Sequence, residues 1–269
     1  MGLELIKPVK SILEKVKEIT NKEVEFIEKS DLKTYAATKL ARKNMDAHLI
    51  YYKREHDELI NHLIAHECGH ILRMFGMPQE KRLIPMTDQE IMSNVLKEIE
   101  TDITTMSKNI PFDSLSQIIS LWVNGTVRQV TNLPPDIMIE KWLYDDYPDL
   151  RHHQLESIKK QHKEGLAGLS DNVRNLTPRK IYDASNIMNY VFFRLVGFYI
   201  KLNLITAYNQ TLYVNRGKEL ANYTEKNYVN TYEGDITMIN YWAKYLGLSD
   251  WFTWTNFENI PKNYLHTHQ

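Results

Sequence analysis

The spacing of apolar residues predicts a mixed region at the start of the chain and a helical region after it. Apolar positions between 9 and 16 recur at helical spacing, so a helix is expected over residues 8–19. Residues 24–27 alternate as a strand does, and residues 34–41 and 48–52 are expected to pair as a hairpin. Residues 48–52 are our candidate for the edge strand of this small sheet.

Two helices are expected next, over residues 57–75 and 87–107, and nearly all of the chain beyond Pro111 has a helical pattern. Asn124-Gly125 and a proline pair interrupt that pattern and favour a boundary between residues 1–125 and 126–269. The pattern leaves open whether the second part is a separate domain or a helical cap. The helices expected beyond Pro111 cover residues 113–123, 135–144, 150–164, 178–204, 217–226 and 235–246.

The expected helix over residues 57–75 contains the segment His66-Glu67-Cys68-Gly69-His70. Residues four apart on a helix are separated by about 400° of rotation, so His66 and His70 share one face. Two imidazoles so placed can hold one Zn²⁺, and Glu67 can then act as the general base toward an activated water. Cys68 lies about 200° round the helix from His66 and is expected to be a small buried side chain.

A zinc hydrolase site needs a third protein ligand and one open position. A third histidine six residues after His70 is excluded, because that residue is Gly76. The helix over residues 87–107 offers carboxylates instead, since Glu98 and Asp102 fall within about 60° of its apolar stripe. Glu98 is therefore the expected third ligand, and Asp102 is expected to accept the outer ring N–H of a ligating histidine and so fix its tautomer. Alternatively, both carboxylates lie at a helix edge and reach water.

These segments resemble the gluzincin peptidases, and most closely the ImmA/IrrE-type zinc peptidases, which carry HE-x-GH followed by a helix reading E-x-x-A-(D/N)-x-F-A. This chain has the first motif at residues 66–70 and Glu98-Ile99-Glu100-Thr101-Asp102 for the second, with Thr101 where the family has Ala. The resemblance covers about residues 20–125. It implies an α+β fold that is mainly helical, with a small zincin-like sheet packed on the HExxH helix and a helical C-terminal half.

Composition is that of a folded enzyme without a strong charge bias. The net charge of −1 gives no overall attraction to nucleic acid or to an anionic membrane. The single cysteine excludes an internal disulfide and suits a reducing compartment. The start of the chain lacks the apolar core of a signal peptide, and the most apolar stretch, residues 187–205, contains charged residues. The expected location is the cytoplasm, with no membrane partner.

The residue that stabilises the oxyanion is not identified by the sequence. His62 lies on the same helix face as His66. It is expected to be a core or cleft histidine, or one that contacts a metal-binding side chain, and not a metal ligand itself. The candidates for the oxyanion role are the imidazoles and phenols downstream, namely His152, His153, Tyr144, Tyr147 and Tyr182.

The sequence thus predicts a zinc metallopeptidase that hydrolyses peptide bonds, with one Zn²⁺ per chain and an intracellular protein or peptide as its substrate. The substrate's identity and the oligomeric state are not predicted. One alternative is a zincin-fold regulatory module that holds metal but acts by binding a partner. Another is an all-helical interaction protein in which the motif arose by chance. Peptide deformylase is a poor match, because its metal is bound by a Cys upstream of HExxH.

Overall fold

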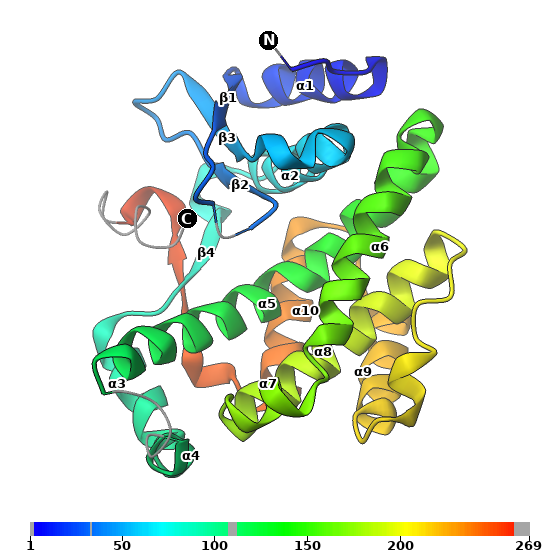
Figure 1. Cartoon of the computed structure of the whole chain (residues 1–269). Coiled ribbons are helices and arrows are strands. Elements are labelled where there is room, and N and C mark those ends of the chain that lie inside the picture. The colour runs from blue at the N-terminus through cyan, green and yellow to red at the C-terminus, as the bar shows by residue number, and fades with distance from the viewer. Residues whose placement is uncertain (1–2, 33, 107–111, 261–269) are drawn as a thin grey trace. The chain divides into compact units, whose positions relative to one another are not determined.

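The computed structural model describes residues 3–32, 34–106 and 112–260, and it is mostly helical with two small sheets in that part of the chain (Figure 1). The chain forms two compact units. The first consists of residues 1–84, 138–160 and 255–269, and the second of residues 85–137 and 161–254. The mainly helical α+β class expected from the sequence is confirmed.

The first unit begins with α1 (Lys7–Thr20), which matches the helix predicted from apolar spacing. Pro8 stands in its first turn, where the missing N–H costs no hydrogen bond. Val9, Ile12 and Val16 are fully buried and define the apolar stripe, and α1 packs against α2 (Ile60–Phe75) along it. The helix ends at Asn21, whose left-handed backbone returns its N–H to the carbonyl of Lys17.

Three strands follow, β1 (Glu23–Glu28), β2 (Ala36–Lys39) and β3 (Ala47–Tyr52), in the spatial order β1-β3-β2. β1 is parallel to β3 and β2 is antiparallel to it, so the predicted strand and hairpin are confirmed. The prediction that residues 48–52 form the edge is wrong, because β3 pairs on both sides and is the central strand. The outer strands are β1 and β2, and β2 is the one that pairs with β3 in the hairpin.

A 3-10 segment, η1 (Arg54–Leu59), leads from β3 into α2, which carries the HExxH motif. After α2 the unit continues through η2 (Gln79–Lys81) into β4 (Leu83–Met86). β4 forms the second small sheet with β5 (Thr253–Asn256), and β5 is followed by η7 (Phe257–Asn259). Figure 1 shows α1 and α2 side by side next to the strands.

The last part of the first unit comes from much later in the chain. It contains the end of α5 (Phe112–Asp146), η4 (Pro148–Leu150) and the first residues of α6 (Arg151–Ala167). α5 approaches α2 closely at Gly69, where an added Cβ would lie 2.7 Å from Ile139 Cγ2. The glycine of the HExxH segment therefore sets how near this carboxyl-terminal half of α5 can come to the motif.

α5 replaces the two helices predicted over residues 113–123 and 135–144, and Pro134 and Pro135 lie inside it. An interior proline costs roughly 3 kcal/mol because it removes a backbone hydrogen bond and crowds the preceding turn. Buried apolar residues stand on both sides of the pair, among them Val130 and Ile137. The helical packing of both halves offsets the local cost, and so the predicted interruption does not occur.

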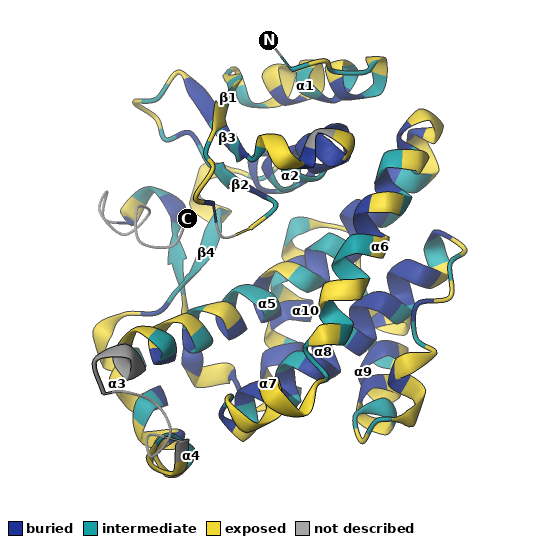
Figure 2. Ribbon diagram, in the orientation of Figure 1, coloured by how far each residue is buried: buried dark blue, intermediate teal, exposed yellow. Residues whose placement is uncertain are grey.

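The second unit is helical. Its predicted ligand helix is divided at Ile99 into α3 (Gln89–Glu98) and α4 (Glu100–Met106), while residue 107 lies outside the described residues. Figure 2 colours the buried stretches of α8 (Arg179–Tyr199) dark blue. Tyr190 and Phe193 on this helix lie in the core. The other elements are α7 (Asp171–Asn175), α8 (Arg179–Tyr199), η5 (Ala207–Gln210), α9 (Val214–Asn227), α10 (Tyr232–Leu246) and η6 (Ser249–Trp251).

The contact of Gly69 with Ile139 predicts a coupled effect of two substitutions. Gly69→Ala should destabilise the protein by about 1–3 kcal/mol, because the overlap outweighs the higher helix propensity of Ala. Ile139→Ala should also destabilise it, through a cavity. The double variant should lose less stability than the sum of the two single losses, by about 0.5–3 kcal/mol, measured by urea unfolding. Strictly additive losses would show that the two residues do not touch.

Candidate metal centre

The HExxH motif lies in the middle of α2, where the helix has a buried and a partly open side. Ile64, Cys68 and Ile71 are fully buried, whereas His66 and His70 are only half-buried. Burial raises the pKa of the Cys68 thiol, so this residue is a small core side chain, as the sequence predicts. The apolar side of α2 fixes the helix in the unit, and the other side presents the imidazoles.

The two imidazoles of the motif face one another. His66 Nε2 lies 3.2 Å from His70 Nε2. Two nitrogens bound to a tetrahedral Zn²⁺ at about 2.05 Å lie about 3.3 Å apart. The separation of the two ring nitrogens therefore fits a shared zinc ion.

The other ring nitrogen of His66 is fixed by a carboxylate that the sequence analysis missed. Glu140, on α5, accepts a hydrogen bond from His66 Nδ1 at 2.8 Å. A carboxylate only accepts, so the proton of His66 is on Nδ1 and the lone pair of its Nε2 points toward His70. This tautomer is the one that a metal at Nε2 requires.

Glu140 has two further partners in the first unit. His62 Nε2 lies 3.0 and 3.1 Å from its two oxygens, and Gln154 Nε2 lies 2.6 Å from Oε2. The side chains of His62 and Glu140 are each 1% exposed. Burial alone would raise the pKa of Glu140, but the positive charge of His62 and the hydrogen bonds from His62 and His66 hold it well below its usual value. The carboxylate is therefore ionised and saturated with donors.

His62, His66 and Glu140 form a group of side chains that could hold a metal ion. His62 was expected to be a cleft, core or second-shell histidine, and the structure places it in contact with the carboxylate that orients His66. The sequence contains one signal for Glu140, because it stands three residues after Ile137 and three before Leu143, on a buried helical stripe. A position near the apolar stripe of a helix also selected Glu98. The spacing of apolar residues gave no reason to prefer Glu140 over Glu98.

Glu67 points toward the sheet. Its Oε2 accepts a hydrogen bond from the hydroxyl of Thr38 at 2.7 Å, and Thr38 lies on the outer strand β2. The expected general base thus points from α2 toward the outer strand β2.

The structure does not bring Glu98 or Asp102 into a group of metal-ligating side chains among the residues it describes. Glu98 is 44% exposed, so its expected burial is wrong. One of its oxygens pairs with the ammonium of Lys180, and the other accepts from Trp251 Nε1 at 2.9 Å. Asp102 accepts from the backbone N–H of Arg179 at 2.8 Å. Both carboxylates thus have partners within the second unit.

Several candidates for the oxyanion role are engaged elsewhere. Tyr147 Oη accepts from Lys15 Nζ at 2.7 Å, and Tyr182 Oη donates to the carbonyl of Leu169 at 3.1 Å. The remaining candidates have local contacts: His153 Nδ1 lies 2.8 Å from the Glu58 carbonyl, His152 packs edge-on against His153, and the Arg151 guanidinium covers Tyr144. These contacts do not single out an oxyanion partner.

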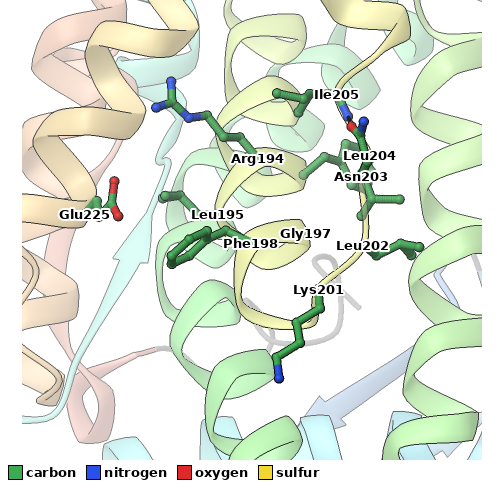
Figure 3. Close-up of a pocket in the computed structure, with 11 residues that line it drawn as sticks. Arg194, Leu195, Gly197, Phe198, Lys201, Leu202, Asn203, Leu204, Ile205 and Glu225 are labelled. Atoms are coloured by element: carbon green, nitrogen blue, oxygen red, sulfur yellow. Dashed lines mark hydrogen bonds between the residues drawn. The ribbon is translucent and has the colours of Figure 1, made fainter.

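A pocket of about 520 Å³ lies in the second unit along the end of α8 and the loop that follows it (Figure 3). Its charged lining residues are Arg194, Lys201 and Glu225, and in Figure 3 Lys201 extends away from the other labelled side chains. No histidine, cysteine or aspartate lines it. This pocket therefore lacks the donor set of a metal centre.

No protein-family model matches the chain, and neither a curated protein nor a solved structure matches it. The likeness to ImmA/IrrE-type peptidases accordingly rests on the sequence motifs. In the described part of the chain, no helix combines the length and the apolar character needed to cross a bilayer.

The ionised, buried Glu140 predicts a specific pH dependence of stability. Its pKa in the folded state is below the unfolded value of 4.5, so its contribution is complete above pH 4.5 and is lost as the pH falls below it. Between pH 6 and pH 3 the wild type should lose about 1–2 kcal/mol more stability than Glu140→Gln, measured by urea unfolding. The exposed Glu90→Gln should keep the wild-type slope. Equal slopes for wild type and Glu140→Gln would contradict this assignment.

Proposed function

We propose that the protein is a zinc-dependent metallopeptidase in which His66 Nε2 and His70 Nε2 are two of the metal ligands. The observation that carries this proposal is the 3.2 Å approach of these two nitrogens, with His66 held in the required tautomer by Glu140. Imidazole nitrogens in this arrangement are typical zinc ligands, and a buried carboxylate behind a ligating histidine is a common second partner.

The group formed by His62, His66 and Glu140 is a less suitable catalytic position. His62 and Glu140 are almost completely buried, and every oxygen of Glu140 already accepts a hydrogen bond. A catalytic metal needs an open coordination position for water and substrate. The side chain of His66 is 17% exposed, so the space between His66 and His70 meets that need better.

Bound zinc would supply Lewis-acid chemistry, lowering the pKa of water and polarising the scissile carbonyl. Glu67 takes the proton from the attacking water and transfers it to the leaving amine. The hydroxyl of Thr38 holds Glu67 Oε2 and so restrains the side chain of the proposed base. Glu140 keeps the His66 ring in place without touching the substrate.

The sheet supports a zincin-like arrangement in this proposal. β2 is the outer strand beside α2, and an outer strand can bind an extended peptide through its backbone. Since Thr38 on β2 contacts Glu67, a peptide bound along β2 would lie next to the proposed base. A protein or peptide segment in extended form is therefore the proposed substrate.

The third ligand is not assigned in this proposal. Both oxygens of Glu98, the ligand expected from the sequence, have partners in the second unit.

The first prediction from this function concerns metal and turnover. Purified protein should hold about one zinc per chain, and His70→Ala should lose it, measured by plasma emission spectrometry. Glu67→Gln should keep the zinc and lose at least about 100-fold in cleavage of a peptide library followed by mass spectrometry. The exposed Glu80→Gln serves as the matched control. Cleavage at the wild-type rate by Glu67→Gln would reject the assignment of the base.

The second prediction tests the ligand expected from the sequence. Glu98→Gln should leave zinc binding unchanged, whereas His66→Ala should weaken it strongly, in a competition with a chelator of known affinity. The stability of both variants is measured in the same samples, so that unfolding is not mistaken for ligand loss. If Glu98→Gln lost zinc while it stayed folded, the ligand expected from the sequence would be the correct one.

A further inference from the structure

Arg42 is a charged residue whose hydrogen-bonding edge is buried without a partner. It begins the turn between β2 and β3, where its carbonyl accepts from the N–H of Met45 at 2.9 Å. Its Nε and Nη2 are both buried and have no hydrogen-bond partner. Its guanidinium carbon lies 5.8 Å from the centre of the Phe257 ring. Unpaired donors on a buried charge are costly, so this edge calls for an acceptor.

The same chain shows what this edge binds. In Arg54, Nε and Nη2 lie 3.1 and 2.7 Å from one carboxylate oxygen of Glu28. These two nitrogens lie on one side of the guanidinium and match the geometry of a carboxylate. In Arg42 the equivalent pair of donors is available, and no described carboxylate forms an ion pair with it.

The surroundings of Arg42 are positively charged. Lys22 donates to the carbonyl of Met45 in the same turn, and the Arg82 guanidinium lies 4.3 Å from the centre of the Phe75 ring. His48 is next to this group, since its Nδ1 accepts from the N–H of Ala41 at 3.1 Å and its ring meets Phe75 edge-on. Burial, followed by the charges of Lys22 and Arg82, lowers the pKa of His48 to about 4.

His48 is thus neutral at pH 7 and adds no charge, while neither Lys22 nor Arg82 forms an ion pair with a carboxylate in the described residues. Lys22 and Arg82 therefore add positive charge around His48 and this turn, which favours an anion there. Arg42 as a whole is half-buried, so other atoms of its side chain reach the surface beside this edge.

We propose that the Nε/Nη2 edge of Arg42 is a receptor for a carboxylate of a bound peptide. This proposal rests on the proposed function, because Arg42 follows β2 by three residues and Thr38 on β2 contacts the proposed base Glu67. A peptide lying along β2 reaches the turn with one of its ends. The carboxylate comes from an acidic side chain or from the C-terminus of the peptide, since both have the same planar shape.

The direct test uses the whole protein and simple anions. The Nε–H resonance of Arg42 is followed by ¹H–¹⁵N NMR during titration with sodium acetate, with sodium chloride added to a reference sample at equal ionic strength. A saturable shift of the Arg42 resonance, absent for Arg54 and absent with chloride, is the expected result. No shift of Arg42 with acetate would overturn the proposal, whether or not the protein cleaves peptides.

The second test identifies the source of the carboxylate. Zinc-loaded wild type, Arg42→Lys and the matched control Arg54→Lys are each given a peptide library with free or amidated C-termini. Arg42→Lys keeps the charge but not the paired donors, so it should lose about tenfold or more in preference for carboxylate-bearing peptides. Loss of preference only for free C-termini indicates a terminal carboxylate, and loss only for acidic positions indicates a side chain. An unchanged preference in Arg42→Lys would overturn the proposal.

The two tests also separate this proposal from the proposed function. If wild-type protein cleaves no peptide but acetate shifts the Arg42 resonance, the peptidase assignment fails and the anion site stands. If cleavage occurs and the resonance does not move, the peptidase assignment stands and the anion site fails.

Discussion

A buried negative charge is stable only when donors surround it, and Glu140 is the residue around which the first unit meets that requirement. His62, His66 and Gln154 all direct N–H groups at its carboxylate, at distances between 2.6 and 3.1 Å. Removing any one of them would leave an acceptor without its partner in a place that water does not reach. This constraint fixes the rotamer of His66, and hence the direction of the nitrogen that faces His70.

The hydrogen bonds of Glu140 also link parts of the first unit that lie far apart in the sequence. Residues 138–160 join residues 1–84 in one compact unit, and they bring both Glu140 and Gln154. The motif on α2 is therefore completed by residues more than 70 positions later in the sequence. The close approach of Gly69 to Ile139 is part of the same arrangement, because a larger residue at 69 would move α5 and its carboxylate away. A boundary near residue 125, as drawn from the sequence, would separate Glu140 and Gln154 from the motif on α2, whereas the first unit contains them all.

Local patterns in the sequence were sufficient for the elements that depend on neighbours along the chain. Apolar spacing predicted α1, the strand β1, the hairpin and the helix that carries His66, Glu67 and His70. The pattern did not predict that β3 is central, because pairing partners on both sides come from outside the strand. It also failed at Pro134 and Pro135, where packing along α5 outweighs a local preference against helix.

The choice between two carboxylates shows the same limit in the site. A helical wheel reports which face of a helix is apolar, but not what stands opposite that face. Glu98 and Glu140 both lie near an apolar stripe, and only the structure shows that one faces Lys180 and Trp251 while the other faces two histidines. The positions of His66 and His70 required no such knowledge, because helix geometry alone brings residues four apart together.

The most direct measurement of the central claim is the position of the metal in crystals of the zinc-loaded protein, located by anomalous diffraction at the zinc edge. The account predicts a single peak about 2.0–2.1 Å from both His66 Nε2 and His70 Nε2, with Glu140 still hydrogen-bonded to His66 Nδ1. A peak coordinated by Glu140 and His62, or no zinc on α2 at all, would contradict it.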